Sequence, residues 1–217
     1  MTPDLSIYLV TDTDQATHAG HTMTNVVLEA VAGGVTAVQI REKNGNTRDM
    51  LDLVETLARR LPDHVALFVN DRIDVFLAAR ARGARVTGVH IGQRDLPPQD
   101  VRALIGDEPL IGLTANTPTD LAEAATNPAR IAYVGIGTVH GTTSKPDAPP
   151  PLGVDGVARL AAASPLPALA IGGITPDDVP ALRKGGLAGV AVVSWVCAAP
   201  DPRAAAAELV RAWECTS

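Results

Sequence analysis

The sequence predicts an α/β protein, a single-domain (β/α)8 TIM barrel, from three observations. Short apolar segments recur along the 217 residues, and alanine-rich segments with helical spacing lie between them. Eight such units give about 27 residues per unit, which suits a parallel sheet with helical crossovers that closes into a barrel. No linker interrupts the series, so we expect one domain over residues 1–217, with a mobile loop at about 138–151.

The predicted strands are apolar runs of a length typical of strands buried on both faces. In chain order they are residues 5–12, 35–41, 65–70, 85–92, 109–114, 130–136, 167–173 and 188–194. A doubly wound open sheet is the alternative, but it would normally carry a glycine-rich turn after its first strand. The segment TDTDQATHAG at that place does not match.

Helices are expected between these strands, because the intervening segments have apolar residues at helical spacing. Examples are residues 24–32, 47–60, 71–81, 117–125, 154–163, 176–184 and 202–213. Several begin with capping residues, as at Thr117 and in the segment TPDD at 175–178, and some end in glycine, as at Gly83 and Gly185.

Composition excludes several classes of protein. The net charge of −6 argues against a nucleic acid or an anionic membrane as partner, and 3% aromatic residues leave few surfaces for stacking bases. No apolar run reaches the roughly 18 residues of a membrane helix, and the first residues do not have the pattern of a secretory signal. Cys197 and Cys215 have no metal-site spacing, so we expect reduced thiols. A cytoplasmic enzyme with small-molecule substrates fits best; the helix faces do not indicate the oligomeric state.

Polar residues follow nearly every predicted strand, where the chemistry of such barrels collects. In chain order these residues are Gln39, Arg41 and Lys43, then Asn70 and Asp71, Asp95, Thr114, the loop with Lys145, Gly172 and Gly173, and Ser194. Cations, carboxylates, hydroxyls and glycines at one rim suit a phosphorylated substrate. The glycine pair allows close approach of the backbone, the helix expected after it would offer N–H groups to an anion, and Ser194 opens the last unit.

Asp71 and Asp95 are separated by one strand and could share Mg²⁺, which takes one or two carboxylates plus phosphate oxygens. The alternative for Asp71 is a cap on the helix that follows it. Arg41 and Lys43 are two residues apart and would share a face of an extended segment. Lys145 lies beside hydroxyls and is expected to stay charged and bind phosphate rather than form a Schiff base. His90 could act as a base, although a hydrogen-bonded strand histidine is the more common case.

These segments together resemble thiamine phosphate synthase over essentially the whole chain. The matching segments are YLVTD, VQIREK, VND, GVHIGQRDLP, IGLTANT, YVGIGTVHGTTSK, AIGGI and VAVVS. The resemblance implies a (β/α)8 barrel that joins a hydroxymethylpyrimidine diphosphate to a hydroxyethylthiazole phosphate and releases diphosphate. It implies ionisation of the pyrimidine C–O bond and capture of the resulting cation by the thiazole nitrogen, which explains why no nucleophile or base stands out.

The resemblance also implies a role for each matching residue. Gln39, Arg41, Lys43 and Asn70 would bind the pyrimidine diphosphate, Asp71 and Asp95 would hold Mg²⁺, and Lys145 would bind the diphosphate. The thiazole phosphate would contact Thr142, Ser144, Gly172 or Gly173, Val193 and Ser194. Arg41, Lys43, Lys145 and Thr114 would carry the catalysis.

Four positions depart from the family pattern. Thr114 stands where the family usually has serine and Ser144 where threonine is usual, and both keep the hydroxyl. Thr138 and His140 stand in place of a proline and an aromatic residue and bear on the shape of their loop.

Three other functions stay open. One is a related thiazole tautomerase, which would need a positioned base and no metal pair. The others are a phosphosugar isomerase or epimerase, which would need a base in the barrel core, and a non-catalytic sensor of a phosphorylated ligand.

Overall fold

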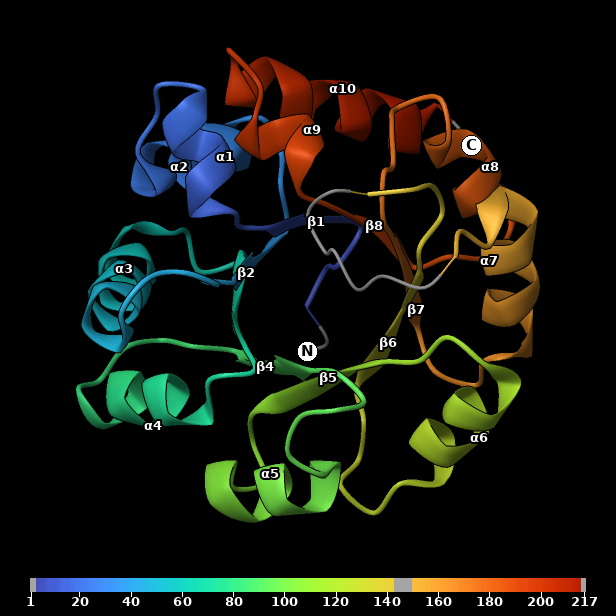
Figure 1. Cartoon of the computed structure of the whole chain (residues 1–217), viewed down its shortest axis with the longest axis horizontal. Helices are drawn as coiled ribbons and strands as arrows, with labels where there is room; N and C mark the ends of the chain where they lie inside the picture. Colours follow the sequence, from blue (N-terminus) through green and yellow to red (C-terminus); the bar gives the residue numbers. More distant parts are fainter. Residues whose placement is uncertain (1–2, 143–149, 216–217) are drawn as a thin grey trace.

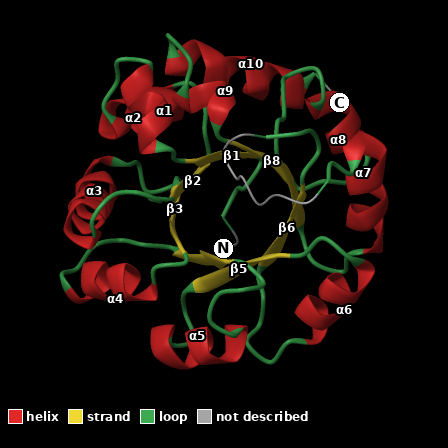
Figure 2. Cartoon of the chain, in the orientation of Figure 1, coloured by secondary structure: helices red, strands yellow, loops and turns green. Residues whose placement is uncertain are grey.

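The computed structural model describes residues 3–142 and 150–215, and the described strands form one closed parallel barrel (Figures 1 and 2). The strands, in the order in which they pair, are β1 (Ile7–Val10), β2 (Ala37–Ile40), β3 (Ala66–Asn70), β4 (Gly88–Ile91), β5 (Leu110–Thr114), β6 (Tyr133–Gly137), β7 (Ala168–Ile171) and β8 (Gly189–Val192). β8 pairs with β1, which closes the barrel and excludes the open sheet. Each predicted strand position is confirmed.

The helices surround the barrel as an outer ring (Figure 2). They are α1 (Thr13–His18), α2 (Met23–Ala32), α3 (Thr47–Arg60), α4 (Ile73–Ala81), α5 (Pro98–Ile105), α6 (Pro118–Thr126), α7 (Gly153–Ala163), α8 (Val179–Lys184), α9 (Ser194–Cys197) and α10 (Pro202–Glu214). None of these helices is long and apolar enough to span a bilayer. Three helices that the sequence examples did not include are α1, α5 and α9, which have only 6, 8 and 4 residues and are too short for a clear helical period.

Two predicted helix starts are wrong. α4 begins at Ile73 and not at Asp71, because Asp71 has a left-handed backbone with φ of 57° and caps nothing. α8 begins at Val179 and not at 176, because the Asp178 carboxylate accepts hydrogen bonds from the backbone and hydroxyl of Thr175 and closes a turn there. The predicted cap at Thr117 is confirmed as a reciprocal capping box with Asp120.

Side chains alternate between two packed layers, as the period of two along a strand requires. On β1, Ile7 and Leu9 belong to the large core between barrel and helices, whereas Tyr8 and Val10 belong to a smaller core inside the barrel. Tyr8 and Tyr133 are the largest fully buried side chains of that inner core. Tyr133 occupies the place that a side chain on Gly112 would need. Large aromatic residues therefore fill the barrel beneath its rim.

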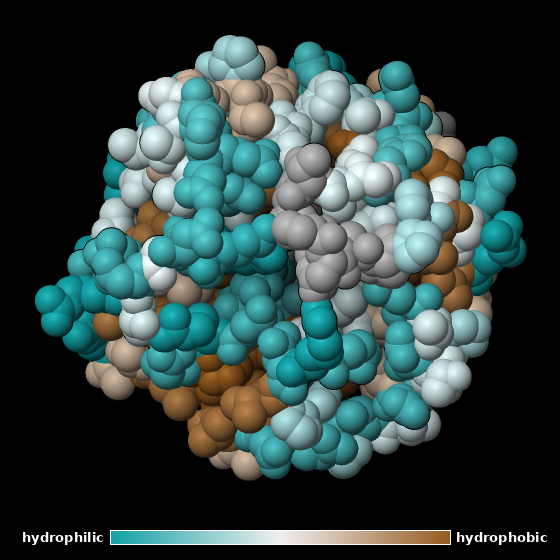
Figure 3. Space-filling model, in the orientation of Figure 1, coloured by the Kyte–Doolittle hydropathy of each residue, from teal (hydrophilic) through white to brown (hydrophobic). Residues whose placement is uncertain are grey.

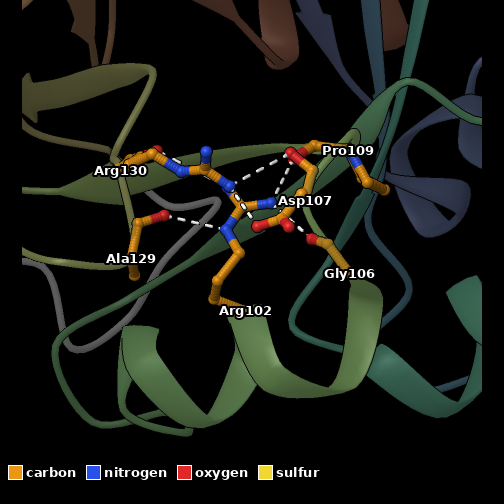
Figure 4. Close-up of polar contacts among 6 residues, drawn as sticks. All are labelled: Arg102, Gly106, Asp107, Pro109, Ala129 and Arg130. Atoms are coloured by element: carbon orange, nitrogen blue, oxygen red, sulfur yellow. Dashed lines mark hydrogen bonds and ion pairs between the residues drawn. The ribbon is translucent and has the colours of Figure 1, made fainter.

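An arginine ties together the chain segments that enter β5 and β6 (Figure 4). Arg102, in the last turn of α5, donates from Nη1 to the carbonyl oxygens of Gly106 and Pro109, both at 2.7 Å. Its Nε donates to the carbonyl oxygen of Ala129 at 2.9 Å. One guanidinium thus satisfies three backbone acceptors that no helix or strand satisfies.

Replacing Arg102 with methionine should lower the free energy of unfolding by about 2 kcal/mol, since partly buried carbonyl groups lose their donors. Chemical denaturation measures the change. The matched control is Arg203→Met, which removes only an exposed ion pair with Glu29 and should cost less than about 1 kcal/mol. Equal losses in the two variants would contradict the role given to Arg102.

Candidate active site

A cavity of about 750 Å³ opens among the carboxyl ends of the strands. Its lining includes predicted site residues from seven strand ends, namely Gln39, Arg41, Asn70, Asp71, Asp95, Thr114, Thr142, Gly172, Gly173, Val193 and Ser194. Hydrophilic residues predominate around the middle of the face seen in Figure 3, which looks down the barrel as Figure 1 does. The structure therefore confirms, for these eleven residues, that distant segments of the sequence meet at one rim of the barrel.

Three other predicted residues are not part of this lining as the structure describes it. Lys43 lines a small recess next to the cavity, together with Arg41, Asp12 and Asp14. Arg41 and Lys43 were expected to share one face of an extended segment, but strand β2 ends at Ile40, before both residues. Ser144 and Lys145, with the centre of the expected loop at 138–151, lie outside the described residues.

The carboxyl groups of Asp71 and Asp95 interact with each other across the ends of β3 and β4. The backbone N–H of Asp71 donates to the carbonyl oxygen of His90 at 2.9 Å, which ties the turn after β3 to β4. Asn70 Nδ2 donates to Asp71 Oδ2 at 2.6 Å, and the Gly92 N–H donates to Asp95 Oδ2 at 2.6 Å. Left-handed backbone at a residue other than glycine costs about 1–3 kcal/mol and clusters at functional sites. Here it brings the two carboxyl groups together.

The pKa of Asp71 is raised to about 7, first by burial and then by the hydrogen bond and charge of Asp95, while Asn70 and Arg41 act in the opposite direction. Two carboxylates this close repel each other unless a proton or a cation lies between them. The pair therefore fits a divalent cation. Among the described residues no third His, Cys, Asp or Glu joins them. That suits Mg²⁺, which keeps several water or phosphate ligands beside one or two carboxylates.

The stability of the metal-free protein should depend on pH through this pair. The folded-state pKa of about 7 lies above the ordinary value of 3.8, so between these values the folded state holds a proton that the unfolded state has lost. Stability should therefore fall as pH rises from about 4 to about 7 and change no further above that. Because Asp71 reaches solvent, we expect only about 1 kcal/mol.

Unfolding in the presence of a chelator at pH 5 and pH 8, compared between the parent protein and Asp71→Asn, measures this effect. The asparagine variant should lack the pH-dependent contribution and should be the more stable of the two at pH 8. A variant that retained the full pH dependence would assign the effect to other groups.

Gln39 and Thr114 approach the cavity from β2 and β5. Gln39 is only 5% exposed, and its Nε2 donates to the Tyr8 hydroxyl at 3.0 Å. His90 on β4 has Nδ1 3.2 Å from the Tyr133 hydroxyl and Nε2 3.1 Å from Thr114 Oγ1. Gln93 Nε2 donates to the carbonyl oxygen of Thr114 at 2.6 Å. His90 is thus a hydrogen-bonded strand histidine, the more common of its two expected states.

The turn after β7 contains two consecutive glycines with left-handed backbone. Gly172 and Gly173 have φ of 101° and 65°, a region that other residues rarely adopt. A Cβ on Gly172 would lie 2.5 Å from Thr138 Cβ, and one on Gly173 would lie 2.9 Å from His140 Cβ. The expected helix does not follow this turn directly, because five residues separate Gly173 from α8.

The turn after β7 is also joined to the loop after β6. The N–H of His140 donates to the carbonyl oxygen of Gly172 at 2.9 Å, and its Nε2 lies 2.9 Å from Asp178 Oδ1. The hydrogen bonds from His140 and Thr175 hold the pKa of Asp178 below its ordinary value, against the effect of burial. His140, one of the departures from the family pattern, thus contacts the segments on both sides of the glycine pair.

Sequence reasoning missed several residues of the cavity, among them Tyr8, Tyr133, Gln93, Asn116 and Trp195. Tyr8 and Tyr133 lie in the apolar strand segments, and only their hydroxyl groups at inward positions could have indicated a polar role. Gln93 stands within the GQRD segment after strand four, where Asp95 alone was selected. Trp195 packs against the core and also lines the cavity.

The fold and the cavity define a (β/α)8-barrel enzyme with its site at the carboxyl ends of the strands. Residues 7–196 match the family model described as thiamine monophosphate synthase. Proteins named thiamine-phosphate synthase from Corynebacterium efficiens and Albidiferax ferrireducens are 43% and 42% identical, over 96% and 94% of this chain and 95% and 90% of their own. The structure of a thiamine phosphate pyrophosphorylase from Pyrococcus furiosus is 30% identical with a TM-score of 0.85, covering 99% of this chain and 98% of that one. The chain belongs to the thiamine monophosphate synthase family, whose named members are transferases.

Proposed function

We propose that this protein is a Mg²⁺-dependent thiamine phosphate synthase. It would join 4-amino-2-methyl-5-hydroxymethylpyrimidine diphosphate to 4-methyl-5-(2-hydroxyethyl)thiazole phosphate and release diphosphate. The observation that carries the proposal is the pair of interacting carboxyl groups of Asp71 and Asp95 in the same cavity as Arg41 and Gln39. Two carboxylates that need a cation, beside an arginine, are what the departure of a diphosphate requires.

In this proposal, the rim at β2, β3 and β4 binds the pyrimidine diphosphate. Arg41, Lys43 and Asn70 would neutralise and orient the diphosphate, with Lys145 as a further cation. Asp71 and Asp95 would hold Mg²⁺, which would supply positive charge to the departing oxygen atoms. The C–O bond would break first, and the pyrimidine ring with its amino group would stabilise the cation that forms.

The opposite side of the rim would hold the thiazole phosphate. Gly172, Gly173, Val193 and Ser194 would offer backbone and hydroxyl donors to its phosphate, with Thr142 and Ser144 beside them. Fixing this phosphate at one end of the cavity would aim the thiazole nitrogen at the pyrimidine carbon. It would also turn a reaction between two molecules into one within a bound complex. Water must stay out, because it would trap the cation.

The tautomerase alternative would need a base, and His90 is the histidine on the cavity wall. Both of its ring nitrogens already have hydrogen-bond partners in the protein, Tyr133 and Thr114. A base in that position would first have to break one of these bonds. The contacts of His90 therefore favour the synthase.

The deciding experiment incubates the purified protein with both precursors and Mg²⁺ and follows thiamine phosphate and diphosphate. We expect both products in equal amounts, and none when a chelator replaces Mg²⁺. Conversion of a thiazole isomer without C–N bond formation would indicate the tautomerase. Binding of the phosphorylated ligands without any product would indicate the sensor, and either result would overturn the proposal.

A further inference from the structure

A continuous chain of hydrogen bonds crosses the inside of the barrel beneath the cavity. It begins at Gln39 on β2, whose Nε2 donates to the Tyr8 hydroxyl at 3.0 Å. The Tyr8 and Tyr133 hydroxyl groups lie 2.8 Å apart, Tyr133 OH lies 3.2 Å from His90 Nδ1, and His90 Nε2 lies 3.1 Å from Thr114 Oγ1. Five side chains from five strands are thus connected, and all five line the cavity.

The orientation of the Gln39 amide, whose nitrogen faces Tyr8, gives this hydrogen-bond chain its direction. Tyr8 and Tyr133 are 1% exposed, and burial raises the pKa of each hydroxyl above its ordinary value, so each keeps its one proton. Tyr8 accepts from Gln39, so its own proton must go to Tyr133, which is its other hydrogen-bond partner among the described residues. Tyr133 must then donate to His90 Nδ1.

The last step fixes the tautomer of the histidine. Because Nδ1 of His90 accepts, a neutral ring carries its proton on Nε2 and donates it to Thr114 Oγ1. The Thr114 hydroxyl, which accepts this bond and lines the cavity, can donate its own proton to a ligand there. At the other end, the Gln39 amide uses its nitrogen for Tyr8 and presents Oε1 as an acceptor.

We propose that Tyr8, Tyr133 and His90 are positioning residues that hold Gln39 as an acceptor and Thr114 as a donor, so that the cavity selects an aminopyrimidine over the corresponding oxopyrimidine. The proposal deepens the proposed function and rests on it for the identity of the ring. An exocyclic amino group donates to Gln39 Oε1, and a ring nitrogen accepts from Thr114. An oxo group would instead set one acceptor against another, in a site where Gln39 has no freedom to turn its amide over.

The amide is held because turning it over requires the whole chain to reverse. If Gln39 offered its oxygen to Tyr8, both tyrosines, the tautomer of His90 and the Thr114 hydroxyl would all have to change direction. The packing of the barrel keeps the members in place: the Tyr8 and Tyr133 rings lie 6.0 Å apart, and each contacts Phe68. Cooperative chains of this kind act as a unit in a buried setting.

The first test needs no ligand. Nitrogen-15 NMR of the imidazole rings, with the His90 signals assigned by comparison with His90→Gln, reports which nitrogen carries the proton. We expect the Nε2–H tautomer in the parent protein. The Nδ1–H tautomer would mean that the chain runs the other way and would overturn the inference, whatever reaction the protein catalyses.

The second test measures binding of the 4-amino and 4-oxo pyrimidine diphosphates by calorimetry, with Mg²⁺ and without the thiazole phosphate. We expect the parent protein to prefer the amino ligand by at least about 30-fold, since a mismatched buried polar group is strongly rejected. Tyr133→Phe and Tyr8→Phe each interrupt the chain and should reduce this preference to within about fivefold. Phe68→Leu alters the same aromatic cluster without touching a polar group and should keep it.

An unchanged preference in a Tyr133→Phe or Tyr8→Phe protein that unfolds cooperatively would overturn the inference. So would a parent protein that prefers the oxo ligand or shows no preference. Formation of thiamine phosphate by the parent protein is measured in parallel. If product forms but the amino ligand is not preferred, only the inference about this hydrogen-bond chain is refuted. If no product forms and neither pyrimidine binds, the proposed function is refuted.

Discussion

Replacing Asp71 with asparagine should reduce the rate of thiamine phosphate formation by about 1,000-fold at saturating Mg²⁺. The variant keeps the shape of the side chain and a hydrogen-bonding oxygen but removes one of the two charges that would hold the cation. The other charge, on Asp95, would then hold Mg²⁺ alone. Steady-state rates across a Mg²⁺ titration check this expectation, and the concentration of Mg²⁺ for half-maximal rate should rise as well.

The matched control for this variant is Asp74→Asn, three residues further along the chain. Asp74 forms an exposed ion pair with Arg72 and is not part of the cavity lining. Its replacement should change the rate by less than about twofold, because exposed ion pairs contribute little. If Asp71→Asn retained the parent rate and the parent Mg²⁺ dependence, the two carboxylates would not form the metal site.

Replacing Gly172 with alanine should weaken binding of the thiazole phosphate by about 100-fold and lower the free energy of unfolding by several kcal/mol. Two effects add at this position. The backbone φ of 101° is strained for any residue with a Cβ, and that Cβ would lie 2.5 Å from Thr138 Cβ and 2.7 Å from Thr138 Cγ2. To relieve this overlap, the turn after β7 and the loop after β6 must move apart. The KM for the thiazole phosphate and chemical denaturation measure the two effects.

Gly186→Ala separates strain from overlap. Gly186 has a φ of 87°, similar to that of Gly172, but a Cβ there meets no atom within 4 Å. This control should show only the backbone cost of about 1–2 kcal/mol and an unchanged KM. Equal KM values in Gly172→Ala and the parent protein would show that this turn does not bind the phosphate.

Much of the fold could be predicted because its signals are local. Apolar runs such as 65–70 and 188–194 are too short for helices and too apolar for loops, so a strand at each place follows from the segment alone. The capping residues at Thr117 are equally local, and that helix start is confirmed. The start of α4 could not be found in this way, since nothing in the sequence around Asp71 requires a left-handed residue before the helix.

The residues of the candidate site also differ in whether a local sequence signal could predict them. Asn70, Thr114 and the glycine pair were found because each stands at or just after the carboxyl end of a strand, and parallel strands in a closed barrel bring these ends to one rim. Lys43 follows a strand too, yet it lies in the neighbouring recess, because the direction of a side chain beyond a strand end depends on the loop. Tyr8 and Tyr133 could not be found, because a tyrosine in an apolar run looks like any other core residue.

The amino-acid sequence by itself determined the eight strands, the barrel and eleven of the residues at its rim, because these depend on the pattern of single segments. Only the tertiary structure decided which of those residues touch. Asp71 and Asp95 are 24 positions apart in the sequence. In the hydrogen-bond chain that runs from Gln39 through Tyr8 and Tyr133 to Thr114, neighbouring members are 24 to 125 positions apart. Such contacts depend on the register of neighbouring strands and on the volume inside the closed barrel, and neither is a property of any one segment.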